Sequence, residues 1–184
     1  AAGIPDPETT IRPTRDGGLQ YYNGRKPWPK DVSCLRQLPL TDFQLVANPD
    51  FSDLSPLRGM PLQVVRVSLT SVSDLTPLKG APIRELIANT TPITSLESLR
   101  NAPLCTLYIQ NSKISDLSPL STAPLKIINV FRCPITSLDA VARAPLQYLD
   151  ITGTGITSLE FLSGKPIQVL LCSETSIKDF SVLS

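Results

Sequence analysis

The sequence predicts an α/β repeat solenoid, a right-handed coil with a parallel β-sheet on the concave face and short 3₁₀ or α turns on the convex face. Three observations predict it. A phrase of the type Asp-Leu-Ser-Pro-Leu recurs every 21 residues. Within each copy, apolar residues alternate with varied ones, as in a short strand with one buried face. In the recurring phrase two apolar residues, mostly leucines, stand three residues apart, so one helical turn places both on the same side.

The repeat fills most of the 184-residue chain. Regular copies of 21 residues begin at Asp53, Asp74, Ser95, Asp116, Ser137, Ser158 and Asp179. A degenerate copy of 22 residues begins at Asp31, and its strand is expected from Leu40 to Val46. The predicted repeat domain is therefore residues 31–184, with one degenerate copy, six regular copies and the start of another. One coil alone buries too little apolar surface to offset the entropy of ordering it, so we expect the array to fold as a block.

Two segments precede the repeats. Residues 1–18 are polar, contain prolines and glycines and lack a hydrophobic period, so we expect a linker or flexible arm. Residues 19–30 are expected to form a hairpin that caps the first coil, with a tight turn at Asn23-Gly24. The aromatic residues that would cover this end are Tyr21, Tyr22 and Trp28. An aromatic recognition patch is the alternative.

Each strand should bury two residues, at +3 and +5 from the Leu or Ile that follows the repeated proline. The +3 column holds Val65, Leu86, Leu107, Ile128, Leu149 and Leu170. The +5 column holds Val67, Ala88, Ile109, Val130, Ile151 and Cys172. Because equivalent strands stack side by side, each column should form one continuous apolar row.

Small polar residues mark the bend after each strand. At +8 stand Thr70, Thr91, Ser112, Cys133, Thr154 and Thr175. A hydroxyl at this place can bond backbone groups of its own turn and of the neighbouring coil. The Asp or Ser that opens each copy is typical of a helix start, so we interpret the row of carboxylates as caps and not as acid–base pairs.

The pattern L-x-x-L-x-L-x-x-[T/S/C]-x-I, followed by [S/T]-D-L-x-P-L, resembles bacterial leucine-rich repeats, in particular the internalin-like motif N-x-I-S-D-I-S-P-L. It also looks similar to the 21-residue repeats of planctomycete-type proteins. The resemblance covers residues 31–184 and implies a leucine-rich repeat domain, one region of a larger bacterial protein. The chain departs from internalins in having Thr, Ser or Cys where they have Asn, and one residue fewer per repeat.

The composition favours a binding protein over an enzyme. The net charge is +1, with basic and acidic residues interspersed, which disfavours nucleic-acid and anionic-lipid partners. No apolar run is long enough to span a bilayer. The chain has no histidine, the commonest general base and metal ligand. We therefore predict no catalytic residues, no cofactor and no metal.

The four cysteines, Cys34, Cys105, Cys133 and Cys172, lie in different coils and different columns. This spacing disfavours disulfides and metal binding, and we expect small side chains that are buried or half-buried. The absence of cysteine-rich flanks favours a reducing compartment such as the cytoplasm, while a surface or secreted location stays open.

The exposed strand face predicts the function. Its apolar residues at +2, +4 and +6 are Ile87, Tyr108, Ile127, Phe131, Tyr148, Val169 and Leu171. An apolar centre with a polar rim is typical of a protein-binding surface. We predict that a protein partner binds this concave face through Arg66, Glu85, Ile87, Tyr108, Ile127, Asn129, Phe131, Tyr148, Asp150 and Leu171.

The last copy suggests a second function. It stops before its strand and leaves the preceding coil without a successor, exposing Leu170, Cys172, Ile177, Phe180 and Leu183. Such an end favours an excised part of a longer chain or docking on another molecule. The alternative function is therefore a structural element that self-associates through this end.

Overall fold

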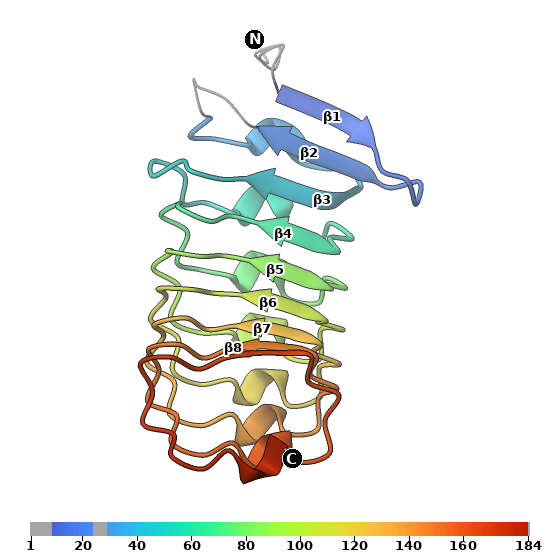
Figure 1. The fold of residues 1–184 in the computed structure, drawn as a ribbon. Coiled ribbons are helices and arrows are strands. Elements are labelled where there is room, and N and C mark those ends of the chain that lie inside the picture. Colours follow the sequence, from blue (N-terminus) through green and yellow to red (C-terminus); the bar gives the residue numbers. More distant parts are fainter. Residues whose placement is uncertain (1–8, 24–28, 184) are drawn as a thin grey trace.

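The computed structural model describes residues 9–23 and 29–183 of the chain, and within them nine strands form one sheet in sequence order (Figure 1). The strands are β1 (Thr9–Pro13), β2 (Leu19–Asn23), β3 (Leu40–Leu45), β4 (Val64–Arg66), β5 (Glu85–Ile87), β6 (Thr106–Tyr108), β7 (Ile127–Asn129), β8 (Tyr148–Asp150) and β9 (Val169–Leu171). The helical turns are all 3₁₀: η1 (Ser33–Leu35), η2 (Ser55–Leu57), η3 (Thr76–Leu78), η4 (Glu97–Leu99), η5 (Ser118–Leu120), η6 (Asp139–Val141), η7 (Glu160–Leu162) and η8 (Ser181–Leu183).

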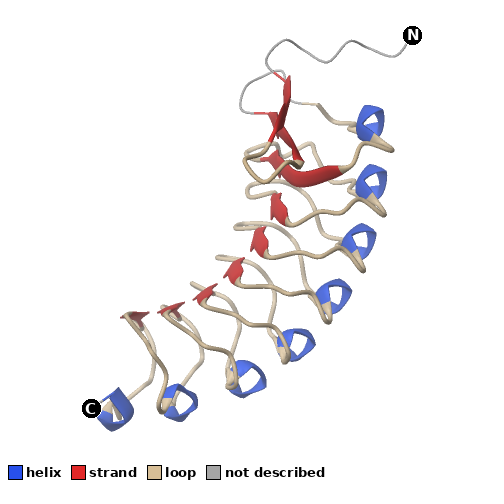
Figure 2. Ribbon diagram, turned by 90° about the vertical axis from the view of Figure 1, so that its right-hand side faces the viewer, coloured by secondary structure: helices blue, strands red, loops and turns tan. Residues whose placement is uncertain are grey.

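The strands lie along the inner side of an arc and the 3₁₀ turns along its outer side (Figure 2). Strands β2 to β9 run parallel, and from β4 onward the register advances by one repeat at each step. Only β1 is antiparallel to its neighbour. The solenoid predicted from the period is confirmed, with its convex side built from single 3₁₀ turns.

The apolar columns meet in a continuous interior. Val65, Leu86 and Leu107 pair in successive strands, and their side chains have no exposed surface. The row continues through Ile128 and Leu149, and it ends at Leu170, which is half-buried because no further strand covers it. The predicted +3 column is therefore confirmed, and each coil supplies one wall of its neighbour's core.

Every coil bends at +7 with a left-handed backbone. The residues at this position, with φ between 52° and 69°, are Ala47, Leu69, Thr90, Asn111, Arg132, Gly153 and Glu174. The bend lets the +7 amide reach the next coil, and the Leu69 N–H donates to the Asn89 carbonyl at 2.9 Å. These backbone bonds between coils hold the residue in a region that side chains usually avoid.

The +8 residue closes the same bend. The Thr70 hydroxyl donates to the Val67 carbonyl of its own coil at 2.6 Å, and Thr91 and Thr154 make the equivalent bond. Cys133, in the same column, donates instead to the Ile109 carbonyl of the preceding coil at 3.0 Å. The predicted bonding of these hydroxyls within their own turn is confirmed, whereas the bond to a backbone group of another coil is made by the Cys133 thiol.

The N-terminal segment differs from the prediction. Residues 9–18, expected in a linker or flexible arm, form β1 and the turn that joins it to β2, so the expectation is wrong for them. The hairpin turn spans residues 14–17, where the Gly17 N–H donates to the Thr14 carbonyl at 3.2 Å, and Gly17 follows the two central residues with a left-handed φ of 83°. The predicted turn at Asn23-Gly24 and Trp28 lie outside the described residues, except for Asn23 at the end of β2.

Strand β2 covers the first coil. Tyr21 is 2% exposed and stacks on Phe43 of β3, with ring centroids 5.3 Å apart and an interplanar angle of 9°. Phe43 in turn contacts Phe51 at 6.0 Å. Tyr22 follows Tyr21 along the strand and therefore lies on the opposite face of the sheet, where it is partly exposed.

Candidate functional site

The concave face carries the +2 and +4 residues of each strand, and its two halves differ in character. The half over β3 to β5 is charged, and we call it the polar region, with Asp42, Gln44, Arg66 and Glu85. The half over β6 to β9 we call the aromatic region, with Tyr108, Ile127, Asn129, Phe131, Tyr148, Asp150, Val169 and Leu171. Ile87 of β5 lies between the two regions, next to Tyr108 in the register.

In the polar region, Arg66 and Glu85 are already paired within the chain, while the Asp42 carboxylate accepts the Thr41 hydroxyl at 2.7 Å. The Arg66 guanidinium donates through Nε to Glu85 Oε1 at 2.7 Å and places Nη2 at 2.6 Å from the same oxygen. Its Nη1 also donates to Gln44 Oε1 at 3.3 Å. The Arg66 and Glu85 side chains are 34% and 24% exposed, so solvent screens the pair only partly. This internal pairing lowers the availability of both residues to a partner.

The aromatic region contains a contiguous apolar row across β7 to β9. The register places Ile127 beside Tyr148 and Tyr148 beside Val169. On the next row, Tyr108 lies beside Asn129 and Asp150 lies beside Leu171. Val169 and Leu171 are 41% and 43% exposed, because β9 has a neighbour on one side only. The structure thus brings the predicted apolar residues of β6 to β9 together.

Two polar members of the predicted site are buried within the aromatic region. Asn129 is 2% exposed and Asp150 is 6% exposed, although both were expected among the polar neighbours at the rim. The Asn129 amide donates through Nδ2 to Asp150 Oδ2 at 3.0 Å. Larger neighbouring side chains cover these two short residues. Their row also holds Tyr108 and Leu171, and on their own strands Ile127 and Tyr148 stand two residues before them.

Each buried residue also accepts a hydrogen bond from the backbone N–H two residues further along its own coil. Asn129 Oδ1 accepts the Phe131 N–H at 3.1 Å, and Asp150 Oδ1 accepts the Thr152 N–H at 3.0 Å. At the same +6 position two coils earlier, the Gln110 N–H donates to Asn89 Oδ1 at 3.0 Å. The +6 amide thus obtains a side-chain acceptor in each of these three coils.

The environment of Tyr148 raises the pKa of its phenol. Partial burial raises the pKa of its phenol, and the charge of Asp150 and the nearby Tyr108 raise it further, while a hydrogen bond with Asn129 opposes the shift. The Tyr148 hydroxyl is therefore neutral at physiological pH and remains a hydrogen-bond donor.

One edge of the aromatic region carries a cation–π pair. The guanidinium carbon of Arg132 lies 5.0 Å from the centroid of the Phe131 ring. Arg132 Nη2 also approaches Glu174 Oε2 at 3.3 Å, with both side chains more than half exposed. The pair orders Phe131 at the edge, although an exposed ion pair contributes little to stability.

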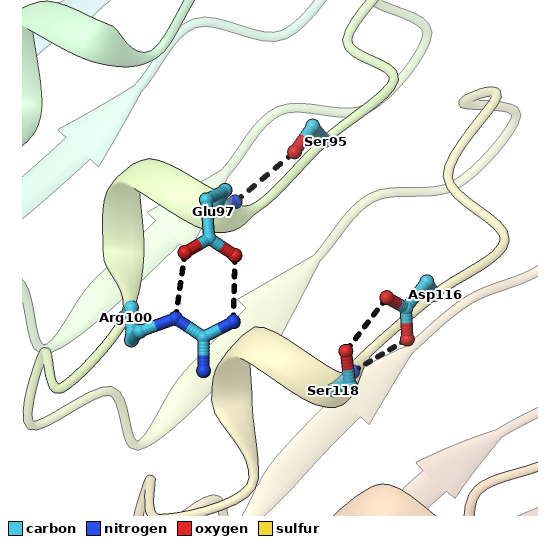
Figure 3. A network of polar contacts seen from close by, with 5 residues as sticks. All are labelled: Ser95, Glu97, Arg100, Asp116 and Ser118. Carbon is cyan, nitrogen blue, oxygen red and sulfur yellow. Dashed lines mark hydrogen bonds and ion pairs between the residues drawn. The ribbon is translucent and has the colours of Figure 1, made fainter.

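The carboxylates of the convex turns serve the turns themselves (Figure 3). Asp116 accepts the Ser118 N–H through Oδ1 and the Ser118 hydroxyl through Oδ2, both at 2.7 Å. These bonds lower the pKa of Asp116. Glu97 instead accepts two bonds from the Arg100 guanidinium, at 2.6 and 2.7 Å, and its pKa is also lowered. The row therefore stabilises the starts of the turns, as expected, but it acts from the residue before the N-cap, and the N-cap of η5, Leu117, makes no side-chain bond.

The four cysteines of the described part of the chain are free and differ in exposure. Cys133 is buried and Cys105 and Cys172 are intermediate, but Cys34 is exposed, so the expectation of a buried or half-buried side chain is wrong for Cys34. Burial raises the pKa of the Cys133 thiol, which disfavours the reactive thiolate. Across residues 9–23 and 29–183, no three His, Cys, Asp or Glu side chains gather as metal ligands would. None of the helices described there is long and apolar enough to cross a membrane.

Comparison with known proteins places the fold. No family model matches the chain, and no curated protein matches it. Among solved structures, an internalin (inlF) from Listeria monocytogenes matches with a TM-score of 0.56 and 22% identity, over 84% of this chain and 68% of that one. Internalin C2 from the same species matches with a TM-score of 0.69 and 20% identity, over 90% and 75%. A plant ice-binding protein matches with a TM-score of 0.67 and 18% identity, over 90% and 60%.

These similarities establish an internalin-like leucine-rich repeat fold, as the repeat motif implied. At sequence identities of 18% to 22%, these similarities support the fold alone. The likeness to planctomycete-type repeats stays a prediction.

Proposed function

We propose that the protein is a non-catalytic interaction module that binds a protein partner through the aromatic region of its concave face. The leucine-rich repeat fold supports a protein-interaction role in general. The finer assignment rests on one observation, that partly exposed aromatic and aliphatic side chains lie contiguously on β6 to β9. Aromatic residues are enriched at the centres of protein interfaces, where they contribute most of the binding energy.

The dimensions of the face fit this role. Seven strands, β3 to β9, at a spacing of about 4.8 Å span roughly 29 Å. A standard interface buries about 800 Å² on each partner, which a surface of this length accommodates. In our proposal the chain is one region of a larger bacterial protein.

The test replaces two aromatic side chains by charges. We expect Tyr108→Asp with Phe131→Asp to abolish capture of the partner, because each change buries an unpaired carboxylate at the interface. The melting temperature should change little, since both side chains are partly exposed. Affinity capture with the immobilised protein, followed by binding measurements on the purified captured protein, provides the readout.

A matched control carries the same charges elsewhere. Thr94→Asp with Thr122→Asp adds two carboxylates at exposed positions outside the strands, and it should capture the partner as the unmodified protein does. Equal capture by the Tyr108 and Phe131 variant would contradict the proposal. Loss of folding in that variant would instead make the two rings part of the core.

A second candidate function is self-association through the C-terminal coil. Phe180 and Leu183 are 46% and 47% exposed, and β9 pairs with β8 alone. Exposed apolar side chains beside an unpaired strand edge favour pairing with a second copy. Light scattering should then show a mass that rises with concentration and returns to the monomer in Phe180→Asp. A monomer at every concentration would remove this candidate.

A further inference from the structure

We propose that the partner presents a basic side chain, and that its positive charge binds the Asp150 carboxylate beside Tyr148. This inference rests on the proposed function, because it names the chemistry of the partner that the aromatic region would receive. Its starting point is Asp150, a buried carboxylate without an oppositely charged neighbour in the aromatic region.

Asp150 supplies the acidic charge of the aromatic region. The other residues at +2, +4 and +6 of the coils that contain β6 to β9 are neutral. Within the described residues, the ion pairs of the concave side join Arg66 to Glu85 and Arg132 to Glu174, and no cation pairs with Asp150. Asp150 is thus a carboxylate that is 6% exposed and has no oppositely charged partner among the described residues.

The carboxylate retains capacity for a further partner. Its two bonds come from neutral donors, the Asn129 amide and the Thr152 backbone N–H. An ionised carboxylate has about four acceptor positions, so about two remain for a donor that approaches from the concave side. A guanidinium or ammonium group supplies both the hydrogen bonds and the missing charge.

The surrounding rings favour the same ligand. Tyr108 shares its row with Asn129 and Asp150, while Tyr148 precedes Asp150 by two residues on the same strand face. The face of a tyrosine ring attracts cations within about 6 Å. A basic side chain that enters here therefore meets a carboxylate and aromatic surface together.

The structural role of Asp150 does not require a charge. Its Oδ1 accepts the +6 amide, and in the preceding coil the neutral Asn129 performs the same task through Oδ1. An acid at position 150 therefore adds a negative charge that this backbone bond does not need. Charge complementarity assigns that charge to the partner.

The experiment uses a displayed library of random peptides selected on the full chain. We expect the selected peptides to contain an Arg or Lys whose replacement by citrulline or norleucine weakens binding about tenfold or more. Asp150→Asn should weaken the same peptides to a similar extent. Asp139→Asn, the same chemical change on the convex turn η6, should leave their affinity unchanged.

The outcomes separate this inference from the proposed function. The peptide-side replacement tests it even if Asp150→Asn unfolds, which a thermal melt reveals. Peptides that need Tyr108 but tolerate loss of their basic residue overturn the inference and leave the proposed function in place. Peptides that bind equally well to the Tyr108→Asp and Phe131→Asp variant, or a selection that yields no binder, overturn both.

Discussion

The +7 residue carries the tightest constraint on single side chains in this fold. Seven coils place it in the left-handed region, yet one of the seven is glycine and one is asparagine, the two residue types that tolerate this region best. Leu69, at φ 58° and 53% exposed, combines an unfavourable backbone with little burial. The bend takes this conformation with every residue type, and Glu174 takes it without a following coil in the described residues, so residue type at +7 affects stability and not the fold.

Leu69→Asn should therefore stabilise the protein. We expect the free energy of unfolding to rise by about 0.5–1 kcal/mol, because asparagine adopts left-handed φ with less strain and the exposed leucine loses little packing. Urea denaturation of both proteins measures the difference.

The reverse change provides the control. Asn111→Leu, at the same position two coils later, should lower the free energy of unfolding by a similar amount. A gain of stability in this variant, or a loss in Leu69→Asn, would show that side-chain packing at +7 outweighs backbone strain.

At the scale of elements, a recurring side-chain-to-backbone bond starts each 3₁₀ turn. In the first, the Asp31 carboxylate accepts the Ser33 N–H at 2.7 Å, and Asp53, Asp74, Asp116 and Asp179 repeat this bond. Three copies use serine instead, with longer bonds of 3.0–3.2 Å. Each turn is three residues long, so this single bond is a large part of what defines its start.

Acid should weaken the turns that begin with aspartate. The bonds from Thr76 and Ser118 hold the pKa of Asp74 and Asp116 below the ordinary value of 3.8. A lowered folded-state pKa stabilises the protein above the unfolded value, and this contribution is lost as pH falls through the folded value. The free energy of unfolding should thus be constant near neutral pH and decline below about pH 4.

Asp74→Asn with Asp116→Asn tests the origin of this decline. Asparagine can accept the same backbone bond but does not titrate, so the variant should lose less stability between about pH 5 and pH 3 than the unmodified protein. The effect is small because both carboxylates are exposed, and urea midpoints at several pH values resolve it. Identical pH profiles would assign the acid sensitivity to other groups.

Across the whole molecule, stability should vary from the centre of the array to its C-terminal end. Leu107 is fully buried between neighbouring coils, whereas the equivalent Leu170 is covered on one side. Because each coil depends on its neighbours, the central coils should unfold together with the rest, and the last coil should open at lower cost.

Leu107→Ala and Leu170→Ala measure this difference. We expect Leu107→Ala to lower the free energy of unfolding by about 2–5 kcal/mol and to keep a single transition. Leu170→Ala should cost about 1 kcal/mol, since part of the side chain already contacts water. Chemical denaturation followed by fluorescence and by circular dichroism provides the measurement, and two separate transitions for Leu107→Ala would contradict folding as one block.

Much of this fold could be predicted from the sequence because the period supplies the same information many times. The recurrence of an apolar residue at Val65, Leu86 and Leu107 predicts a core position, whereas a single valine or leucine could be either buried or exposed. The β1–β2 hairpin lies outside the period, and the Asp16-Gly17 dipeptide in its turn is a local signal within a polar segment. This segment was misassigned because no repeated copy supports its interpretation.

The candidate site was only partly predictable. Alternation along the strands identifies which residues face outward, and the register follows from the period. The burial of Asn129 and Asp150 could not be predicted, because it depends on the sizes of neighbouring side chains in three dimensions. The left-handed backbone at +7 could not be predicted either, because Ala47, Leu69 and Arg132 share no chemical property that favours positive φ.

The constant register between successive strands has an evolutionary consequence. Because each coil offers the next one the same pattern of backbone donors and acceptors, unequal recombination that removes or duplicates a whole copy leaves every remaining junction intact. An insertion within a strand would misalign the columns, whereas the extra residue of the 22-residue copy leaves Phe43 paired with Val65. The inner surface can thus be recomposed by shuffling complete units, so new recognition properties arise in lineages without passing through an unfolded ancestor.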